Sequence, residues 1–263
     1  MRVLIVGYGR MGSALGEAWI AKGLVSKLIA VDPSANSSTV ECYSDMEKMP
    51  KIIFDVVVVA VKPQYVSAAL PSIAAYHLGH STVVISVAAG IPILTLLAHL
   101  PQGTAVVRAM PNTPVLLGAG CTGMFSSVGS LSLSARERVT NLFSAVGTCY
   151  WVEEERHLDI VTAISGSGPA YFHLFCESLF DAGVRMGLSR QLARNLVVDT
   201  AWGAAVLQRH PQADFAALRQ NVTSPNGTTA AAIGIFEENG GLRKLVASAT
   251  DAARLRSEEM SRA

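Results

Sequence analysis

The chain has 263 residues, of which half are hydrophobic and 16% are charged, and its net charge at neutral pH is +1. This length fits one large domain or two modest ones, and the balanced charge excludes the basic surface that nucleic-acid binding requires. The four cysteines lack the spacing of a zinc site or a disulfide framework, so we expect no bound metal and a cytoplasmic location.

Short β-branched segments alternate with helical stretches over residues 1 to 150. The expected strands are 2–6, 27–31, 55–61, 82–87 and 104–109, with further candidates at 119–125 and 148–152. The run Val56–Val61 is continuously apolar, as expected of a central parallel strand covered on both faces. The alternation predicts right-handed β-α-β units and therefore an α/β fold with a doubly wound, mostly parallel sheet.

The loop after the first expected strand reads Gly7-Tyr8-Gly9-Arg10-Met11-Gly12 and opens a helix. This pattern is typical of dinucleotide-binding Rossmann domains. The first glycine allows a tight turn, the second lets the backbone approach the pyrophosphate, and the third lets helix and strand pack closely. The pyrophosphate would lie on the free N–H groups of the helix N-terminus. We therefore expect a nicotinamide dinucleotide to contact Gly7, Gly9, Arg10, Met11 and Gly12.

Asp32 follows the second expected strand, about 20 residues after the last glycine of the loop. A carboxylate there accepts hydrogen bonds from the adenosine ribose, which favours NADH and repels the 2′-phosphate of NADPH. No lysine or arginine lies between Lys27 and Lys48 to offset that charge. The alternative is that Asp32-Pro33 only shapes a turn, while Ser34, a further cofactor-binding candidate, holds a phosphate together with Asn36 and Ser37.

The carboxyl ends of parallel strands line the ligand crevice of an open α/β sheet. We therefore expect the loops after the next two strands to contact the cofactor as well, and we call this edge of the sheet the cofactor edge. The expected contacts there are Ala60, Val61, Lys62, Pro63, Ala88 and Gly90. Lys62 has the alternative of being an ordinary solvated loop lysine. The apolar stretch from Val83 to Ala98 is interrupted by Ser86, Gly90 and Pro92, and it predicts a strand, a turn and a helix instead of a membrane span.

No further strand is expected after Glu154, and helical patterns extend over 168–186, 189–209 and 226–260. This change predicts a Rossmann domain at 1–153 and an all-helical domain at 154–263. The stretches 169–186 and 192–207 are apolar on most faces, so they must be buried on most faces. We expect a dimerisation core in which the helices of two chains interleave; a self-contained helical bundle is the alternative.

Three loops combine small hydroxyl residues, glycine and proline, at 108–114, 165–171 and 221–229. In the third loop, Pro225 suits the first turn of a helix, and the hydroxyl and N–H groups form an anion site that a small carboxylate would fit. The alternative is that Ser224-Pro225 is an ordinary helix cap. We include Asn112, from the first loop, and Asn221, from the third, among the cofactor-binding candidates.

These segments together resemble the pyrroline-5-carboxylate reductase family over essentially the whole chain. The resemblance is carried by residues 7–12, 61–64, 86–90, 108–114, 165–171 and 222–229. It implies an N-terminal Rossmann domain, an interleaved helical dimer, an active site between one chain's cofactor domain and the partner's helical domain, and in some members decamers. Two residues depart from the family pattern. Asn226 stands where glycine is usual, and Asp32 stands where many relatives have residues suited to NADPH.

The activity that the resemblance implies is the last step of proline biosynthesis, hydride transfer from NADPH or NADH to the C=N carbon of 1-pyrroline-5-carboxylate. A protonated imine is already electrophilic, so no nucleophile or metal is required. We assign the substrate carboxylate to Ser224, Gly227, Thr228 and Thr229. Thr229 is the catalytic candidate, because its hydroxyl would hydrogen-bond the ring nitrogen. Most of the rate would come from holding the two rings in reactive geometry.

Two other functions remain as alternatives. One is a different imine reductase or 3-hydroxyacid reductase, of which the latter places a catalytic lysine on a helix of the second domain. The helices after residue 164 offer only Lys244 for that role. The other is a dinucleotide-binding protein without catalytic activity, against which the polar loop Thr223–Thr229 argues.

Overall fold

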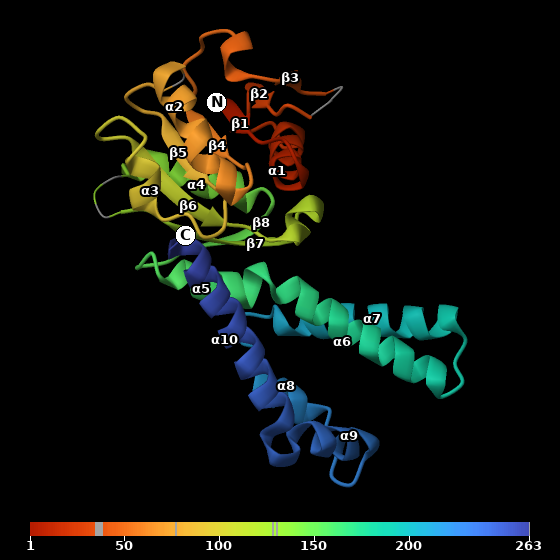
Figure 1. The fold of residues 1–263 in the computed structure, drawn as a ribbon. Coiled ribbons are helices and arrows are strands. Elements are labelled where there is room, and N and C mark those ends of the chain that lie inside the picture. Colours follow the sequence, from red (N-terminus) through yellow and green to blue (C-terminus); the bar gives the residue numbers. More distant parts are fainter. Residues whose placement is uncertain (35–38, 77, 128, 130, 263) are drawn as a thin grey trace. The chain divides into compact units, whose positions relative to one another are not determined.

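A computed structural model of the protein describes residues 1–34, 39–76, 78–127, 129 and 131–262. It contains two compact units, Met1–Ser167 together with Ala252–Ala263, and Gly168–Asp251. The first unit holds the sheet and the second consists of helices (Figure 1). As expected, strands alternate with helices in the first part of the chain and only helices follow in the described residues after Trp151. The domain limits 1–153 and 154–263 stay a prediction.

The first unit is built on one eight-stranded sheet with the order β3-β2-β1-β4-β5-β6-β7-β8. Its strands are β1 (Arg2–Val6), β2 (Lys27–Val31), β3 (Glu41–Tyr43), β4 (Val56–Val59), β5 (Val83–Ser86), β6 (Ala105–Met110), β7 (Gly120–Phe125) and β8 (Gly147–Trp151). All neighbouring strands are parallel except β6 and β7. The doubly wound, mostly parallel sheet is confirmed, and its strand order reverses between β1 and β4, where Val6 pairs with both Val31 and Val59.

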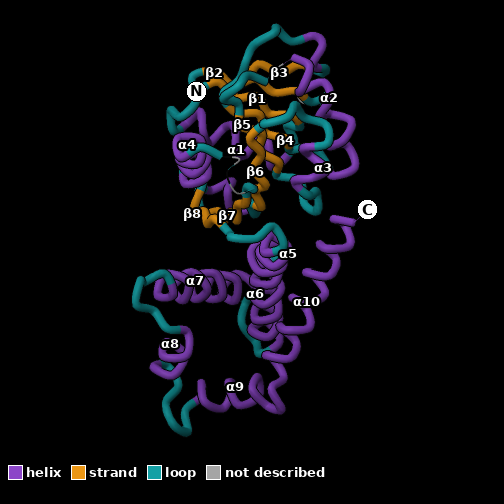
Figure 2. Tube along the Cα trace, turned by 90° about the vertical axis from the view of Figure 1, so that its left-hand side faces the viewer, coloured by secondary structure: helices purple, strands orange, loops and turns teal. Residues whose placement is uncertain are grey.

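Helices cover both faces of this sheet. They are α1 (Arg10–Ala21), α2 (Val66–Tyr76), α3 (Ile93–Leu97), α4 (Leu133–Ser144) and α5 (His157–Val161), with short turns at Met46–Lys48, Pro63–Tyr65, Thr113–Leu117 and Thr162–Gly166. Figure 2 shows α1 and α4 on one side of the sheet and α2 and α3 on the other. Trp19 of α1 is fully buried beside Phe143 of α4 and donates from Nε1 to the carbonyl oxygen of Leu142 at 2.7 Å. Because β4 lies between these two apolar layers, all four of its valines are buried.

The regular elements of the second unit, within its described residues, are all helices. Its helices are α6 (Gly168–Arg185), α7 (Arg190–Gln208), α8 (Phe215–Asn221), α9 (Thr228–Glu237) and α10 (Gly241–Arg262), whose last residues belong to the first unit. The helical pattern expected over 226–260 consists of two helices, α9 and α10. A short turn at Glu238–Gly240 separates α9 from α10, because Asn239 and Gly240 have positive φ angles of 52° and 69°. Helix α8 was not expected from the sequence.

The packed pair α6 and α7 leaves large apolar side chains uncovered within the chain. Phe172 and Trp202 are 69% and 70% exposed, and the buried residues of α6 are only Gly168 and Gly183. A self-contained bundle would bury these faces, so the exposure favours their cover by another chain. Within the described residues, no helix combines the length and apolar character needed to cross a membrane.

Candidate active site

The glycine loop after β1 lies directly against the loop after β4. Gly7 has a φ of 94°, and a Cβ atom there would lie 2.6 Å from the Ala60 carbonyl carbon and from the Val61 nitrogen. Gly12, in the first turn of α1, packs equally closely against the loop itself, because a Cβ atom there would lie 2.1 Å from the Gly7 carbonyl oxygen. Both glycines are therefore required by packing. They bring the carboxyl ends of β1 and β4 together at the reversal in strand order, where dinucleotides bind in open α/β sheets.

Gly9 differs from these two glycines, because a Cβ atom there would meet no described protein atom within 4 Å. Gly9 is the residue before α1, and no side chain of the described part of the chain caps that helix. The first N–H groups of a helix have no partner inside it. This open, uncapped N-terminus would fit the pyrophosphate of a dinucleotide.

Asp32 connects the glycine loop to the loop after β2. One carboxylate oxygen accepts from the Tyr8 N–H at 2.8 Å, and the other accepts from the N–H and hydroxyl of Ser34 at 2.9 and 2.8 Å. The turn-shaping role considered from the sequence is therefore present. It leaves the ribose role open, because a carboxylate oxygen accepts more than one hydrogen bond. Asn36 and Ser37 lie outside the described residues.

The side chain of Tyr8 is buried in the hydrophobic core, so it is not a candidate for contact with a ligand. Burial, the largest cause, raises the pKa of Tyr8 to about 12, and the nearby charges of Glu17 and Cys42 add to that effect. The phenol therefore stays neutral at physiological pH. Within the described residues its hydroxyl has no hydrogen-bond partner.

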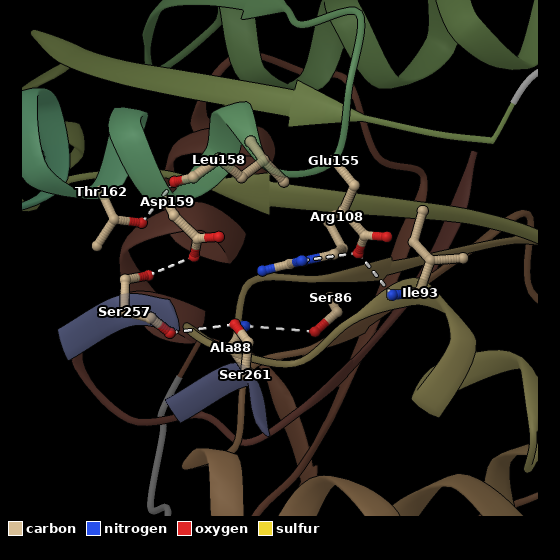
Figure 3. A network of polar contacts seen from close by, with 10 residues as sticks. All are labelled: Ser86, Ala88, Ile93, Arg108, Glu155, Leu158, Asp159, Thr162, Ser257 and Ser261. Atoms are coloured by element: carbon tan, nitrogen blue, oxygen red, sulfur yellow. Dashed lines mark hydrogen bonds and ion pairs between the residues drawn. The ribbon is translucent and has the colours of Figure 1, made fainter. Parts of the chain in front are cut away.

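The loop after β5 is fixed at both ends by buried polar contacts (Figure 3). At its start, the Ser86 hydroxyl accepts from the Ala88 N–H at 3.4 Å. At its end, the Glu155 carboxylate accepts from the Ile93 N–H at 2.7 Å. The same carboxylate oxygen accepts from Arg108 Nη1 at 2.7 Å, and the Arg108 side chain is only 8% exposed. Charge-assisted hydrogen bonds of this kind are among the stronger ones in proteins, so the Glu155 carboxylate restrains the end of the loop.

Two other cofactor candidates have contrasting surroundings. Lys62 is exposed at the start of the turn Pro63–Tyr65. Asn112 is buried, and its amide connects two segments of the first unit. It donates to the carbonyl oxygen of Ser165 at 3.0 Å and accepts from the Cys121 N–H at 2.9 Å. Asn112 therefore has a clear structural role, and its contact with a cofactor stays a prediction.

The polar loop of the second unit forms a turn between α8 and α9. The Gly227 N–H donates to the carbonyl oxygen of Ser224 at 3.0 Å, and Asn226 has a φ of 58°. Proline at the second position and positive φ at the third define a type II turn. Pro225 therefore lies in this turn and not, as expected, in the first turn of a helix. Asparagine tolerates positive φ, so this residue type suits the third position of the turn.

The turn leads into another helix start that lacks a side-chain cap within the described residues. Gly227 precedes α9, and Thr228 and Thr229 are its first two residues. Thr223 donates its hydroxyl proton back to the carbonyl oxygen of Arg219 at 2.6 Å. The structure therefore brings the predicted substrate residues Ser224, Gly227, Thr228 and Thr229 into one turn of the chain, in the second unit, while the glycine loop lies in the first.

Three charged side chains connect α8, α9 and α10. Glu237, at the end of α9, accepts from Arg219 of α8 at 3.2 Å. It also accepts from Nε and Nη2 of Arg243, at the start of α10, at 2.8 and 2.6 Å. The hydrogen bonds from Arg243, aided by the charges of both arginines, lower the pKa of Glu237 below its ordinary value of 4.5. The carboxylate therefore links the end of α9 to α8 and to the start of α10.

Sequence reasoning did not find the network around Glu155, Arg108 and Asp159. The Glu155–Arg108 pair spans 47 positions, and Asp159 is bonded to Ser257 across 98 positions. No local pattern connects such distant residues. One signal was available: a buried arginine requires a partner, and Arg108 lies inside a strand, β6, that is otherwise apolar.

Comparison with known proteins matches both parts of the chain. Residues 155–260 match the family described as pyrroline-5-carboxylate reductase dimerisation, and residues 2–90 match the family described as NADP oxidoreductase, coenzyme F420-dependent.

Full-length relatives are found among both sequences and solved structures. The chain is 39% identical to the pyrroline-5-carboxylate reductase of Pseudomonas aeruginosa, over 99% of this chain and 97% of that protein. It resembles the crystal structure of the Plasmodium falciparum pyrroline carboxylate reductase with NADP bound, with a TM-score of 0.88, 33% identity and coverage of 99% and 98%. The Coxiella burnetii pyrroline-5-carboxylate reductase gives a TM-score of 0.89 at 32% identity, with 98% of each chain covered.

Proposed function

The chain belongs to the pyrroline-5-carboxylate reductase family, and on that premise we propose that it reduces the C=N bond of 1-pyrroline-5-carboxylate to give L-proline. The observation that carries the proposal is the 39% identity over 99% of the chain. A relationship of this extent includes both the glycine loop and the distant polar turn. We place the reaction as the last step of proline biosynthesis. A cytoplasmic location stays our proposal from the cysteines, which lack the spacing of a disulfide framework.

NADPH or NADH, when bound, supplies the hydride for the imine carbon. We propose that the carboxyl ends of β1, β4 and β5 hold it. The proposed contacts are Gly7, Gly9, Arg10, Met11, Gly12, Asp32, Ser34, Ala60, Val61, Lys62, Pro63, Ala88, Gly90, Asn112 and Asn221. The uncapped N-terminus of α1 supports a pyrophosphate at Gly9. The carboxylate of Asp32, near the adenosine ribose, supports a preference for NADH.

We propose that the polar turn before α9 binds the substrate carboxylate. Its N–H groups and hydroxyls, from Ser224, Gly227, Thr228 and Thr229, hold an anion without a lysine or arginine in direct contact. The Thr229 hydroxyl would hydrogen-bond the ring nitrogen and so orient the imine carbon. The chain then contributes alignment, which is enough for an imine that is already electrophilic once protonated. The rival reductase chemistry would use Lys244, which is exposed on the first turn of α10.

We also propose a homodimer formed through α6 and α7, with each active site completed by the glycine loop of one chain and the polar turn of its partner. The exposed Phe172 and Trp202 support it, because in water such faces are stable only when another apolar surface covers them. Dimers would assemble further into a decamer, as the resemblance to the family implies. Sedimentation equilibrium measures both states.

The test is an assay of NADPH and NADH oxidation with 1-pyrroline-5-carboxylate, compared with other imines and with 2-keto acids. We expect turnover with the pyrroline substrate alone. Thr229→Ala should lower kcat/KM by about tenfold to a hundredfold, the value of a hydrogen bond to a charged group, with the Kd for NADPH unchanged. Thr250→Ala is the matched control, because its hydroxyl bonds only its own helix. An unaltered kcat/KM in Thr229→Ala would remove Thr229 from the mechanism.

A further inference from the structure

The last turns of α10 return to the first unit and pack on the loop between β5 and α3. Helix α10 begins in the second unit, yet its residues from Ala252 onward belong to the first. The close view in Figure 3 shows Ser257 of this helix directed at Asp159, with Ser261 one turn further along the helix. The C-terminal end of the chain is therefore a neighbour of the proposed cofactor edge.

A buried hydrogen bond anchors this end of the helix. The Ser257 hydroxyl donates to Asp159 Oδ1 at 2.6 Å, and the two residues are only 1% and 8% exposed. A carboxylate buried to this degree requires a hydrogen-bond donor, and Ser257 supplies one. The bond ties α10 to α5, which precedes the helical unit along the chain.

One turn beyond this anchor, the helix backbone contacts the loop after β5. A Cβ atom at Gly90 would lie 2.7 Å from the Cβ of Met260 and 3.1 Å from its carbonyl carbon. Gly90 has a φ of 72° and is buried, so the loop passes beneath Met260 with no space for a side chain. The contact restrains the middle of a loop whose ends are already held by Ser86 and Glu155.

We propose that Ser257 and Met260 are positioning residues for the dinucleotide. They hold the Ala88–Gly90 loop, whose backbone would contact the cofactor, in its binding conformation. Neither residue touches the cofactor or the substrate in this proposal. The inference rests on the proposed function only in taking that loop as part of the cofactor site. Its consequence is that cofactor affinity depends on the last turns of the chain.

The experiment compares two serines that lie one turn apart. Ser257→Ala removes the donor from Asp159, and we expect the Kd for NADPH, measured by fluorescence titration of the full-length protein, to rise about tenfold. Ser261→Ala is the matched control, because its hydroxyl donates only to the Ser257 carbonyl oxygen within the same helix. It should bind NADPH as the wild type does. In Ser257→Ala the KM for NADPH should rise while kcat at saturating NADPH stays within about twofold of the wild type.

A second variant keeps the proposal testable if Ser257→Ala does not fold. A chain ending at Glu259 retains the Ser257–Asp159 bond and loses the contact between Met260 and Gly90, and it should also bind NADPH more weakly. A wild-type Kd in these variants, with a folded protein, would overturn the inference. A loss of kcat with an unchanged KM for NADPH would overturn it too. Failure of the wild type itself to bind NADPH or NADH would refute the proposed function instead.

Discussion

Replacing Gly9 with alanine separates a ligand role for this glycine from a structural one. The backbone at Gly9 has a φ of −75° and a ψ of −160°, which any residue adopts, and its Cβ would meet no described atom within 4 Å. Alanine in place of glycine at such a position stabilises a protein by about 0.5 kcal/mol. Alanine is a much poorer N-cap residue than glycine, by roughly 0.5–1 kcal/mol, and this offsets the gain. The free energy of unfolding should therefore change by less than about 1 kcal/mol.

The same methyl group would occupy the space in front of α1 where we place the pyrophosphate. We expect the Kd of Gly9→Ala for NADPH and NADH to rise at least about tenfold, or about 1.4 kcal/mol. Gly12→Ala is the contrasting variant, because its Cβ would lie 2.1 Å from the Gly7 carbonyl oxygen. It should cost about 1–3 kcal/mol of stability. Urea denaturation and fluorescence titration measure both quantities. A stable Gly9→Ala protein that binds the dinucleotide normally would refute the placement of the pyrophosphate.

Three further substitutions test other features. Asp32→Ser should move the preference towards NADPH; an NADPH/NADH ratio of kcat/KM equal to that of the wild type would exclude the ribose role. Asn226 has a φ of 58°, a backbone angle that alanine tolerates less well than asparagine does. Asn226→Ala should therefore lower the free energy of unfolding, measured by urea denaturation, by about 1 kcal/mol, whereas Asn226→Gly should not lower it. Glu237 has a lowered pKa in the folded protein, so its stabilising effect is present above its ordinary value of 4.5 and disappears as the pH falls below it. Glu237→Gln should therefore be less stable than the wild type at neutral pH and equally stable in acid.

The sheet and the glycine loop could be predicted because their signals are local. The four valines of β4 are apolar in succession because helices cover both faces, and the glycines are fixed by contacts with the adjacent strands. Strand β3 was missed, because the three residues Glu41–Tyr43 are too few to show a periodicity. The break between α9 and α10 had a signal, since Asn239-Gly240 is a turn dipeptide. The alanine-rich helical pattern around it masked that signal.

The candidate site was predictable only where backbone groups carry the function. The turn at Ser224–Gly227 was found by its residue types, but the proline was placed in the wrong turn. The residue after the proline, Asn226, indicated the correct turn, because proline followed by a residue that tolerates positive φ is typical of a type II turn. The ion pair of Glu155 and the bond between Asp159 and Ser257 could not be predicted, because chain topology alone brings those residues together.

The helix starts show how the chain divides its polar groups between folding and function. Helices α4, α7 and α8 are capped by Ser132, Ser189 and Asp214, whose side chains accept from N–H groups of the first turn. The start of α3 bonds to Glu155 in the same way. Helix α5 also lacks a side-chain cap, but its first N–H groups donate to the carbonyl oxygens of the preceding turn, Glu154–Arg156. Within the described residues, α1 and α9 have no side-chain cap either, and these are the helices at which we place the pyrophosphate and the substrate carboxylate. A side-chain cap at either start would compete with the ligand for the same donors. Because the N-cap residue of both helices is glycine, the missing side-chain cap costs only about a few tenths of a kcal/mol each, and it keeps the N–H groups available to an anion.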